Sequence, residues 1–258
     1  MEKKIKKSDF IQSLEKGLKV ITVFDSNNEE LTLTDVAKKV GLTRANARRI
    51  LLTLEYLGYV KSRDNKMFSL TAKVLSLGYS FLSSLSFREL AQPYMQQLAA
   101  EVQESCSMSV LEDKQIVYIA RVHTKRIMTI ALGIGTRLPL HATSMGKVLL
   151  ASKNEQERNT ILADCNFESY TDKTITDRNV FLEELQKVCT QGWAMADQEL
   201  ELGVRSIACP IRDSNGETVA ALNISGHAGR VSLEEMKEKF LPALQTTVQK
   251  IENALKSL

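Results

Sequence analysis

One candidate group for nucleophilic acyl transfer in this chain is formed by His141, Ser144 and Asp197. A serine hydrolase needs a serine that is activated by a histidine, which an acidic residue orients. Ser144 stands in Thr-Ser-Met-Gly, which departs from the Gly-x-Ser-x-Gly turn of the α/β-hydrolases. We therefore predict that the protein is not an enzyme and has no catalytic residue. A metabolite-binding, hydrolase-like enzyme that uses these three residues is the alternative.

Ser144 can serve a different chemistry, because it opens a helical segment. Thr143 or Ser144 can cap a helix that continues through Val148 and Leu149, with Met145 in its first turn. The free N–H groups and the positive dipole end of such a helix stabilise a nearby carboxylate by about 1 kcal/mol. The sequence thus predicts an anion-binding helix start, unless the hydroxyl serves only to cap its own helix.

Further polar residues can complete a site for a small organic acid. Arg121 and His141 can pair with its carboxylate, and later strands can supply more polar contacts. None of the 3 histidines has metal-ligand spacing, and Gly133-Ile134-Gly135 lacks the third glycine of a dinucleotide fingerprint, so no metal and no cofactor are expected. The predicted ligand-binding residues are Arg121, His141, Ser144, Met145, Asp197, Ser206, Asn223 and Ser225.

A second group of residues that can do chemistry is basic and lies in the first quarter of the chain. Thr43 can cap a helix whose apolar positions gather on one side, at Ala47, Ile50, Leu51, Leu54 and Leu57. Near its start, where a recognition helix contacts bases in the major groove, the other side presents Arg44, Ala45, Arg48 and Arg49. A solvated helix face is the alternative interpretation of these charges.

The segments around this basic helix predict a winged helix-turn-helix. A first amphipathic helix starts near Ser13, and a short helix capped by Thr34 ends at Gly41. After the basic helix, YVKSRDNKMFSL alternates like two strands joined by a turn. This hairpin is the expected wing, and its cations, which we expect to contact phosphates, are Lys61, Arg63 and Lys66.

The charge distribution agrees with this interpretation. The net charge is +3 over 258 residues, but residues 1–70 alone carry roughly +5, from about 14 lysines and arginines against about 9 acidic residues. This excess indicates double-stranded DNA as the partner of the N-terminal domain. The polar start, the lack of any run of about 20 apolar residues and the scattered cysteines predict a cytoplasmic protein with no membrane contact.

The whole chain predicts two domains and a connector. We expect a DNA-binding domain over residues 1–70, a linker and dimerisation helix over 71–86, and an effector-binding domain over 87–258. The linker is too apolar for an exposed helix without a partner. Strands and helices mix within the last domain, so its predicted class is α+β with an antiparallel sheet.

Two long segments carry a resemblance to a known family: RIMTIALGIGTRLPLHATSMGKVLLAS and GWAMADQELELGVRSIACPIRDSNGETVAALNISGHAGR. The whole chain resembles the IclR family of bacterial regulators, and these segments resemble its subgroup that controls aromatic-acid catabolism through the β-ketoadipate pathway. The resemblance implies a GAF-like effector domain and a homodimer or tetramer on an approximately palindromic operator. It also implies a small carboxylate effector, such as protocatechuate, 4-hydroxybenzoate or β-ketoadipate.

The resemblance also implies roles for individual residues. The family's acid-binding motif aligns onto Ser144, Met145, Asp197, Ser206, Asn223 and Ser225. Some members have Gly-Ala in place of Ser144-Met145, so the bulkier Met145 can line an aromatic ring, and Asp197 can accept a hydrogen bond from a phenolic hydroxyl. The resemblance therefore implies a regulator of a catabolic operon that is controlled by a small aromatic or β-ketoadipate-pathway acid.

Overall fold

The computed structural model describes residues 6, 8–25, 27–64, 66–124 and 132–256. The chain divides into two compact units, Met1–Ser84 and Leu85–Leu258. The expected strand-like segment RIMTIALGIGTRLPL lies in part outside the described residues, because these omit residues 126–131. Within the described ranges, no helix is both long enough and apolar enough to cross a membrane.

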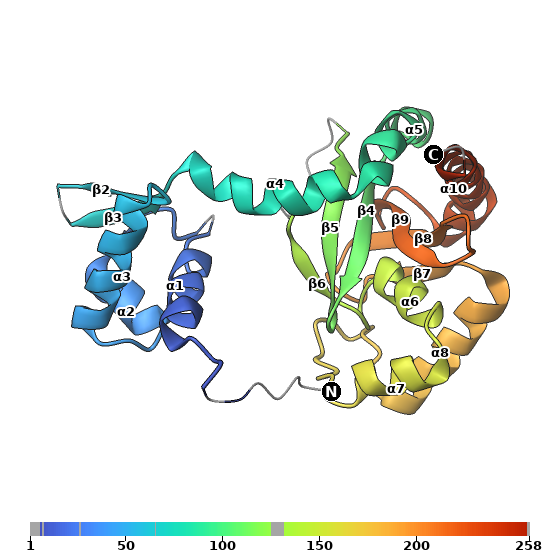
Figure 1. Ribbon diagram of the computed structural model, residues 1–258. Coiled ribbons are helices and arrows are strands. Elements are labelled where there is room, and N and C mark those ends of the chain that lie inside the picture. The colour runs from blue at the N-terminus through green and yellow to red at the C-terminus, as the bar shows by residue number, and fades with distance from the viewer. Residues whose placement is uncertain (1–5, 7, 26, 65, 125–131, 257–258) are drawn as a thin grey trace. The chain divides into compact units, whose positions relative to one another are not determined.

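The described part of the N-terminal unit packs helices against a small antiparallel sheet (Figure 1). The helices are α1 Gln12–Thr22, α2 Leu33–Lys39 and α3 Arg44–Tyr56. The sheet has the order β1-β3-β2, and its strands are β1 Leu31–Thr32, β2 Val60–Arg63 and β3 Met67–Leu70. One apolar core joins these elements through residues that include Val20, Val36, Leu51, Val60 and Phe68. This is the predicted winged helix-turn-helix, with α3 as the basic helix and β2–β3 as the wing.

Local signals set the ends of α2 and α3. The Thr32 hydroxyl accepts a hydrogen bond from the N–H of Asp35, whose carboxylate accepts one from the N–H of Thr32. The predicted cap of α2, Thr34, was therefore wrong, because only Thr32 has an acidic residue three positions later to form this reciprocal capping box. Gly41 takes φ +66° in the turn, and Thr43 caps α3 as predicted.

The connector is a 3-10 turn, Ala72–Val74, followed by α4, Leu75–Ser84. No residue of α4 is buried within the chain. Its large apolar side chains have exposed fractions between 44% and 75%, at Leu75, Leu77, Tyr79 and Phe81. A helix whose large apolar side chains are left exposed by its own chain is typical of an interaction site. The division after Ser84 groups residues 71–84 of the expected linker with the N-terminal unit.

An antiparallel sheet forms the middle of the C-terminal unit. Among the described residues its strand order is β6-β5-β4-β9-β8-β7. Its strands are β4 Ser105–Glu112, β5 Gln115–Val122, β6 Arg137–Pro139, β7 Ala194–Asp197, β8 Val204–Arg212 and β9 Thr218–His227. The predicted α+β class with an antiparallel sheet is confirmed.

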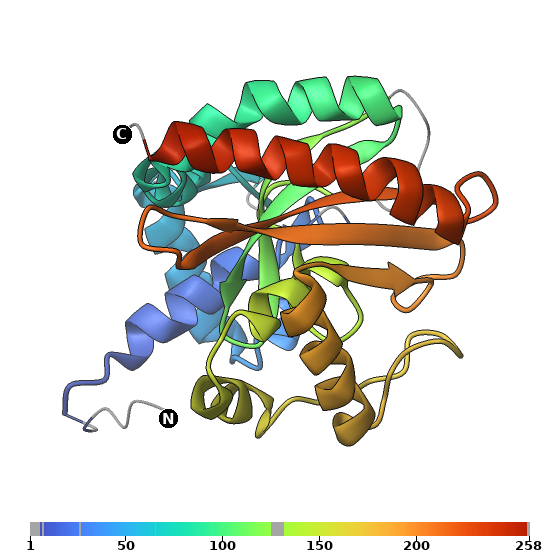
Figure 2. The same cartoon turned by 90° about the vertical axis from the view of Figure 1, so that its right-hand side faces the viewer.

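Helices cover both faces of this sheet (Figure 2). One face carries α5 Ser86–Val102 and α10 Leu241–Leu255, and α10 follows the short helix α9 Leu233–Glu235 and a π-helical segment, Met236–Phe240. The other face carries α6 Ser144–Ala151, with α8 Arg178–Gln191 packed on it, while α7 Glu155–Leu162 connects the two in sequence. Residues 144–150 of α6 are all buried. The start of this helix is therefore held between the sheet and α8.

Candidate anion-binding site and nucleic-acid interface

The first turn of α6 presents unused hydrogen-bond donors. The Thr143 hydroxyl caps the helix by accepting from the N–H of Gly146 at 3.1 Å, and it donates to the carbonyl of Pro139 at 2.9 Å. Among the described residues, no acceptor receives the N–H of Ser144 or of Met145. These two donors and the helix dipole form a seat for a negatively charged group.

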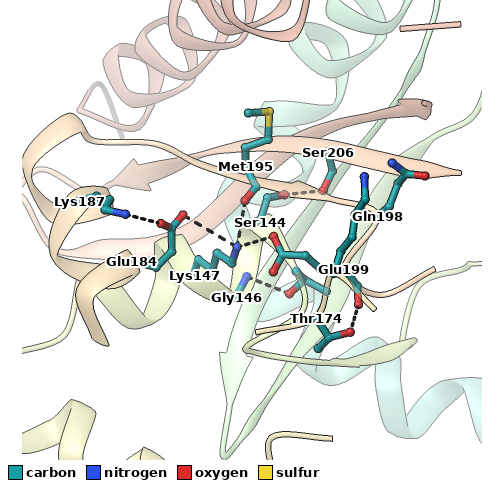
Figure 3. Close-up of polar contacts among 12 residues, drawn as sticks. Ser144, Gly146, Lys147, Thr174, Glu184, Lys187, Met195, Gln198, Glu199 and Ser206 are labelled. Atoms are coloured by element: carbon teal, nitrogen blue, oxygen red, sulfur yellow. Dashed lines mark hydrogen bonds and ion pairs between the residues drawn. The ribbon is translucent and has the colours of Figure 1, made fainter. Parts of the chain in front are cut away.

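Two side chains of this turn hold it against the sheet. The hydroxyls of Ser144 and Ser206 lie 2.8 Å apart, which joins α6 to β8 (Figure 3). The Ser109 hydroxyl donates to the sulfur of Met145 at 3.2 Å, which joins α6 to β4. All four side chains are buried. The structure therefore brings together Ser144 and Ser206 as the sequence analysis expected, and it uses the Met145 sulfur as an acceptor.

Beneath the start of α6, the sheet presents two rows of buried polar residues. Register pairs Ser206 with Ser225 and Ser225 with Ser105, and it pairs Asn223 with Ser107. Because paired residues point to the same face of a sheet, and Ser206 contacts α6, the first row faces that helix. Asn223 stands two positions before Ser225 on β9, so the second row shares the face. Ser206, Asn223 and Ser225 are thus gathered on one surface.

The serines of β4 belong to this surface but were missed by the sequence analysis. Three buried serines of β4 alternate with two residues that face α5 and α10 on the other side of the sheet. The serines are Ser105, Ser107 and Ser109, and the alternate residues are Cys106 and Met108. The signal was present in the segment SCSMSV, because a period of two with a serine at each alternate position is typical of a polar strand face. This polar face does not meet solvent, because α6 covers it.

Arg121 extends the second row by one strand. Its Nη1 donates to the Ser107 hydroxyl at 3.2 Å, and its Nε donates to Nδ1 of His123 at 3.2 Å. The side chain is half-buried, and desolvation lowers the pKa of the guanidinium. No carboxylate of the described residues forms an ion pair with it. An anion that entered this surface would find an unpaired cation.

His141, which was expected to pair with the carboxylate of a ligand, makes its contacts with the segment that follows α7. Its Nε2 lies 2.9 Å from the carbonyl of Glu168, and its ring packs 5.3 Å from Phe167 and 5.8 Å from Tyr170. Burial lowers the pKa of the imidazole. The ring lines a separate cavity of about 330 Å³ with residues of the 162–170 segment. His141 therefore anchors that segment.

Asp197 also lies apart from the serines. Its carboxylate accepts from Nε of Arg205 at 2.7 Å and from Nζ of Lys173 at 3.2 Å. Register pairs Asp197 with Arg205, the neighbour of Ser206 on β8, so both point to the face opposite Ser206. Burial alone would raise the pKa of Asp197, but the hydrogen bonds from the two cations outweigh it and lower the pKa. Among the described residues, neither Asp197 nor His141 bonds to Ser144, so the hydrolase-like arrangement does not form.

The recognition-helix residues lie at the surface of α3. Thr43, Arg44, Ala45, Arg48 and Arg49 are exposed, while Ala47, Leu51 and Leu54 are buried. The same exposed side continues toward the helix end with Leu52 and Tyr56, whose exposed fractions are 40% and 90%. The sequence analysis did not single out these last two, although the same rotation of about 100° per residue places them beside Ala45 and Arg49.

The wing residues lie on the β2–β3 hairpin, where Lys61, Arg63 and Lys66 are exposed. Arg63 differs from the other two, because its Nη2 lies 2.7 Å from Oε2 of Glu30, before β1. Both side chains of this ion pair are exposed, so its contribution to stability is about 0–1 kcal/mol. A phosphate can displace this carboxylate at little cost in free energy.

Comparison with known sequences covers both units. Residues 13–64 match the family model described as the IclR helix-turn-helix domain, and residues 79–253 match the one described as the bacterial transcriptional regulator IclR C-terminal domain. The two matches together span most of the chain.

Individual relatives agree with these matches. The Pca regulon regulatory protein of Pseudomonas putida is 41% identical over 237 residues, which cover 92% of this chain and 81% of that protein. The p-hydroxybenzoate hydroxylase transcriptional activator of Acinetobacter baylyi is 34% identical over 96% of this chain and 93% of its own length. The inducer-binding domain of the Acinetobacter PobR transcription factor, solved as a double mutant with 3-hydroxybenzoic acid, is 32% identical, with a TM-score of 0.62 over 65% of this chain and 98% of that domain.

Proposed function

Because the chain belongs to the IclR family of bacterial transcriptional regulators, and is therefore a DNA-binding regulator and not an enzyme, we propose that a small aromatic carboxylate controls it. The ligand would bind on the polar sheet surface beneath the start of α6. The observation that carries this proposal is Arg121, a half-buried guanidinium with no acidic partner among the described residues. A carboxylate that pairs with it relieves the cost of its burial.

The geometry of the surface suits a ligand the size of an aromatic ring. Arg121 lies on β5 and Ser206 on β8, three strand spacings or about 14 Å apart across the sheet. The arginine side chain spans part of this distance, and Asn223 and Ser225 of β9 lie between Arg121 and Ser206 on the same face of the sheet. Buried hydroxyl and amide groups can then orient a ring hydroxyl. Two of the relatives support an aromatic acid, since their names refer to p-hydroxybenzoate hydroxylase and to a 3-hydroxybenzoic acid complex.

The DNA-binding side of the proposal concerns α3 and the wing. Arg44, Arg48 and Arg49 would read bases and Lys61 and Lys66 would contact phosphates, which makes affinity fall with salt. The exposed apolar side chains of α4 support a second copy of the chain as its partner. A homodimer, or a tetramer made from two dimers, would then bind an approximately palindromic operator in the cytoplasm.

A ligand can control operator binding only if it binds more tightly to one arrangement of the DNA-binding domains in the dimer than to another. A coupling free energy of about 1–3 kcal/mol, or roughly 5- to 150-fold in operator affinity, is typical. The same coupling acts in reverse, so operator DNA must change the affinity for the acid by the same factor. This reciprocity gives a test that needs no knowledge of whether the ligand activates or represses.

The proposal is tested by calorimetric titration of the full chain with 4-hydroxybenzoate and protocatechuate, beside 4-hydroxybenzamide, which lacks the carboxylate. We expect saturable binding of at least one acid, at least tenfold weaker binding of the amide, and loss of acid binding in Arg121→Met. Arg137→Met, at an exposed position of β6, is the matched control and should bind as the wild type does. Equal binding of acid and amide, or no binding of either acid, would refute the proposal.

A further inference from the structure

One cation is buried in the helix that begins the proposed site. Lys147 stands one turn after Ser144 on α6, and its side chain is only 1% exposed. Its Nζ donates to Oε1 of Glu199 at 2.7 Å and to the carbonyl of Met195 at 3.1 Å, and Oε1 of Glu184 lies 4.0 Å away (Figure 3). Lys147 therefore ties α6 to β7, through Met195, and to the turn that follows this strand, through Glu199.

This ion pair is poorly explained as a device for stability alone. Oε2 of Glu199 is buried and has no hydrogen-bond partner among the described residues, and burial raises the pKa of its carboxyl. Two apolar side chains of similar volume would avoid the desolvation cost of both charges and often give equal or greater stability. What an apolar pair cannot reproduce is a directional bond from a helix to one point of a turn.

The turn that holds Glu199 is itself fixed by hydrogen bonds. The Thr174 hydroxyl donates to the carbonyl of Glu199 at 2.6 Å. Thr174 belongs to the segment whose Glu168 carbonyl lies 2.9 Å from Nε2 of His141, just before α6. Contacts therefore run from Lys147 through Glu199 and this segment back to His141, and together with the chain from His141 to Lys147 they form a closed ring that includes the first turn of α6.

From this ring of contacts we propose that Lys147 and Glu199 are positioning residues, which set the height of the α6 start above the polar sheet surface. The proposal rests on the proposed function, because the group positioned is the pair of N–H donors of Ser144 and Met145. Such donors must stay within about 0.5 Å of their working position for full affinity. Neither charged group touches the ligand in this arrangement, and both act through the helix.

The test separates positioning from stability by removing one charge and then both. Lys147→Met leaves a buried carboxylate without its cation, so we expect a strongly lowered unfolding temperature. Lys147→Met with Glu199→Leu removes both charges and should recover most of that loss. In this folded double variant we expect the affinity for 4-hydroxybenzoate or protocatechuate to fall at least tenfold. Wild-type affinity in the double variant would overturn the proposal.

A matched control and a second measurement keep the outcome decisive. Lys114 and Asp164 form an exposed ion pair 3.2 Å long in the same unit, and Lys114→Met with Asp164→Leu should not change the affinity. Amide hydrogen exchange of residues 146–150 without ligand should be faster in the Lys147/Glu199 double variant, with α10 unchanged. If neither acid binds to the wild type, the proposed function fails, but amide hydrogen exchange still tests the positioning role of Lys147 and Glu199. Unchanged exchange in α6 of the double variant would overturn that positioning role.

Discussion

Gly146 lies where a side chain cannot be accommodated, and replacing it with alanine is the most direct test of the close packing around α6. A Cβ atom at this position would lie 2.6 Å from Cα of Leu140 and 2.7 Å from Oγ1 of Thr143, and it would also contact the Leu140 carbonyl oxygen. Two of these atoms are backbone, so they cannot move aside as the end of a flexible side chain can. The helix start must therefore shift away from the Pro139–Leu140 strand end.

Two opposing terms determine the size of the effect of Gly146→Ala. Overpacking of a closed core costs about 1–3 kcal/mol, and rigid backbone neighbours favour the upper end, about 3 kcal/mol. Alanine is the better helix former by about 1 kcal/mol. The net loss in unfolding free energy is about 2 kcal/mol, which lowers the unfolding temperature of a domain of this size by roughly 4–8 °C. Helix propensity alone predicts the opposite sign.

The chain contains a single tryptophan, Trp193, which lies just before β7 in the C-terminal unit, so its fluorescence reports the unfolding of that unit. Gly133→Ala is the matched control, because a Cβ there would meet no atom of the described residues within 4 Å, and we expect its unfolding temperature to stay within about 2 °C of the wild type. An unchanged or raised temperature in Gly146→Ala would refute the packing argument. Gly146→Ala should also weaken acid binding, since it displaces the same N–H donors.

Three further expectations follow from single side chains. Arg48→Ala should weaken operator binding by about 1–3 kcal/mol, as measured by fluorescence anisotropy. The unfolding temperature should not fall, because Arg48 is exposed. Preserved operator affinity would argue against α3 as the recognition helix. Ser206→Ala should cost about 1 kcal/mol in urea unfolding, because it leaves the buried Ser144 hydroxyl without its partner, and no loss would mean that the bond is not formed. Asp197 has a lowered pKa in the folded state, so its stabilisation is present above pH 3.8 and is lost as the pH falls through the folded pKa. Asp197→Asn should therefore be less stable than the wild type at pH 7, and a difference that persisted undiminished at pH 2 would contradict this.

The N-terminal unit could be predicted closely from the sequence because its signals are local. Apolar spacing gives the buried side of α3, and a cap residue and a left-handed glycine give its start and the turn before it. The wrong prediction of Thr34 as the N-cap of α2 shows that a threonine near a helix start does not by itself identify the capping residue. Two threonines stand close together, and only the acidic residue three positions after Thr32 decides between them.

The C-terminal site could be predicted only in part, because it depends on sheet register. Ser144 and Ser206 come together because one opens a helix and the other lies on a strand beneath it. Asp197 stands on a short strand where a shift of one residue reverses its face, and nothing in the local sequence fixes that register. His141 precedes Ser144 by three residues, but its ring packs against a segment that follows α7, and such a contact depends on the tertiary fold.

The ion pair between Arg63 and Glu30 has a consequence for how the protein searches DNA. The glutamate occupies the wing arginine in the absence of DNA, so each encounter with a phosphate begins as an exchange of one anion for another. Such an exchange would lower the binding free energy at non-specific DNA sites, because phosphate contacts supply nearly all of the affinity there. A protein held less firmly at random sites leaves them sooner. If Arg63 contacts phosphate as proposed, we expect Glu30→Gln to lengthen the time spent on incorrect sequences slightly, by no more than the roughly 0–1 kcal/mol of this exposed ion pair.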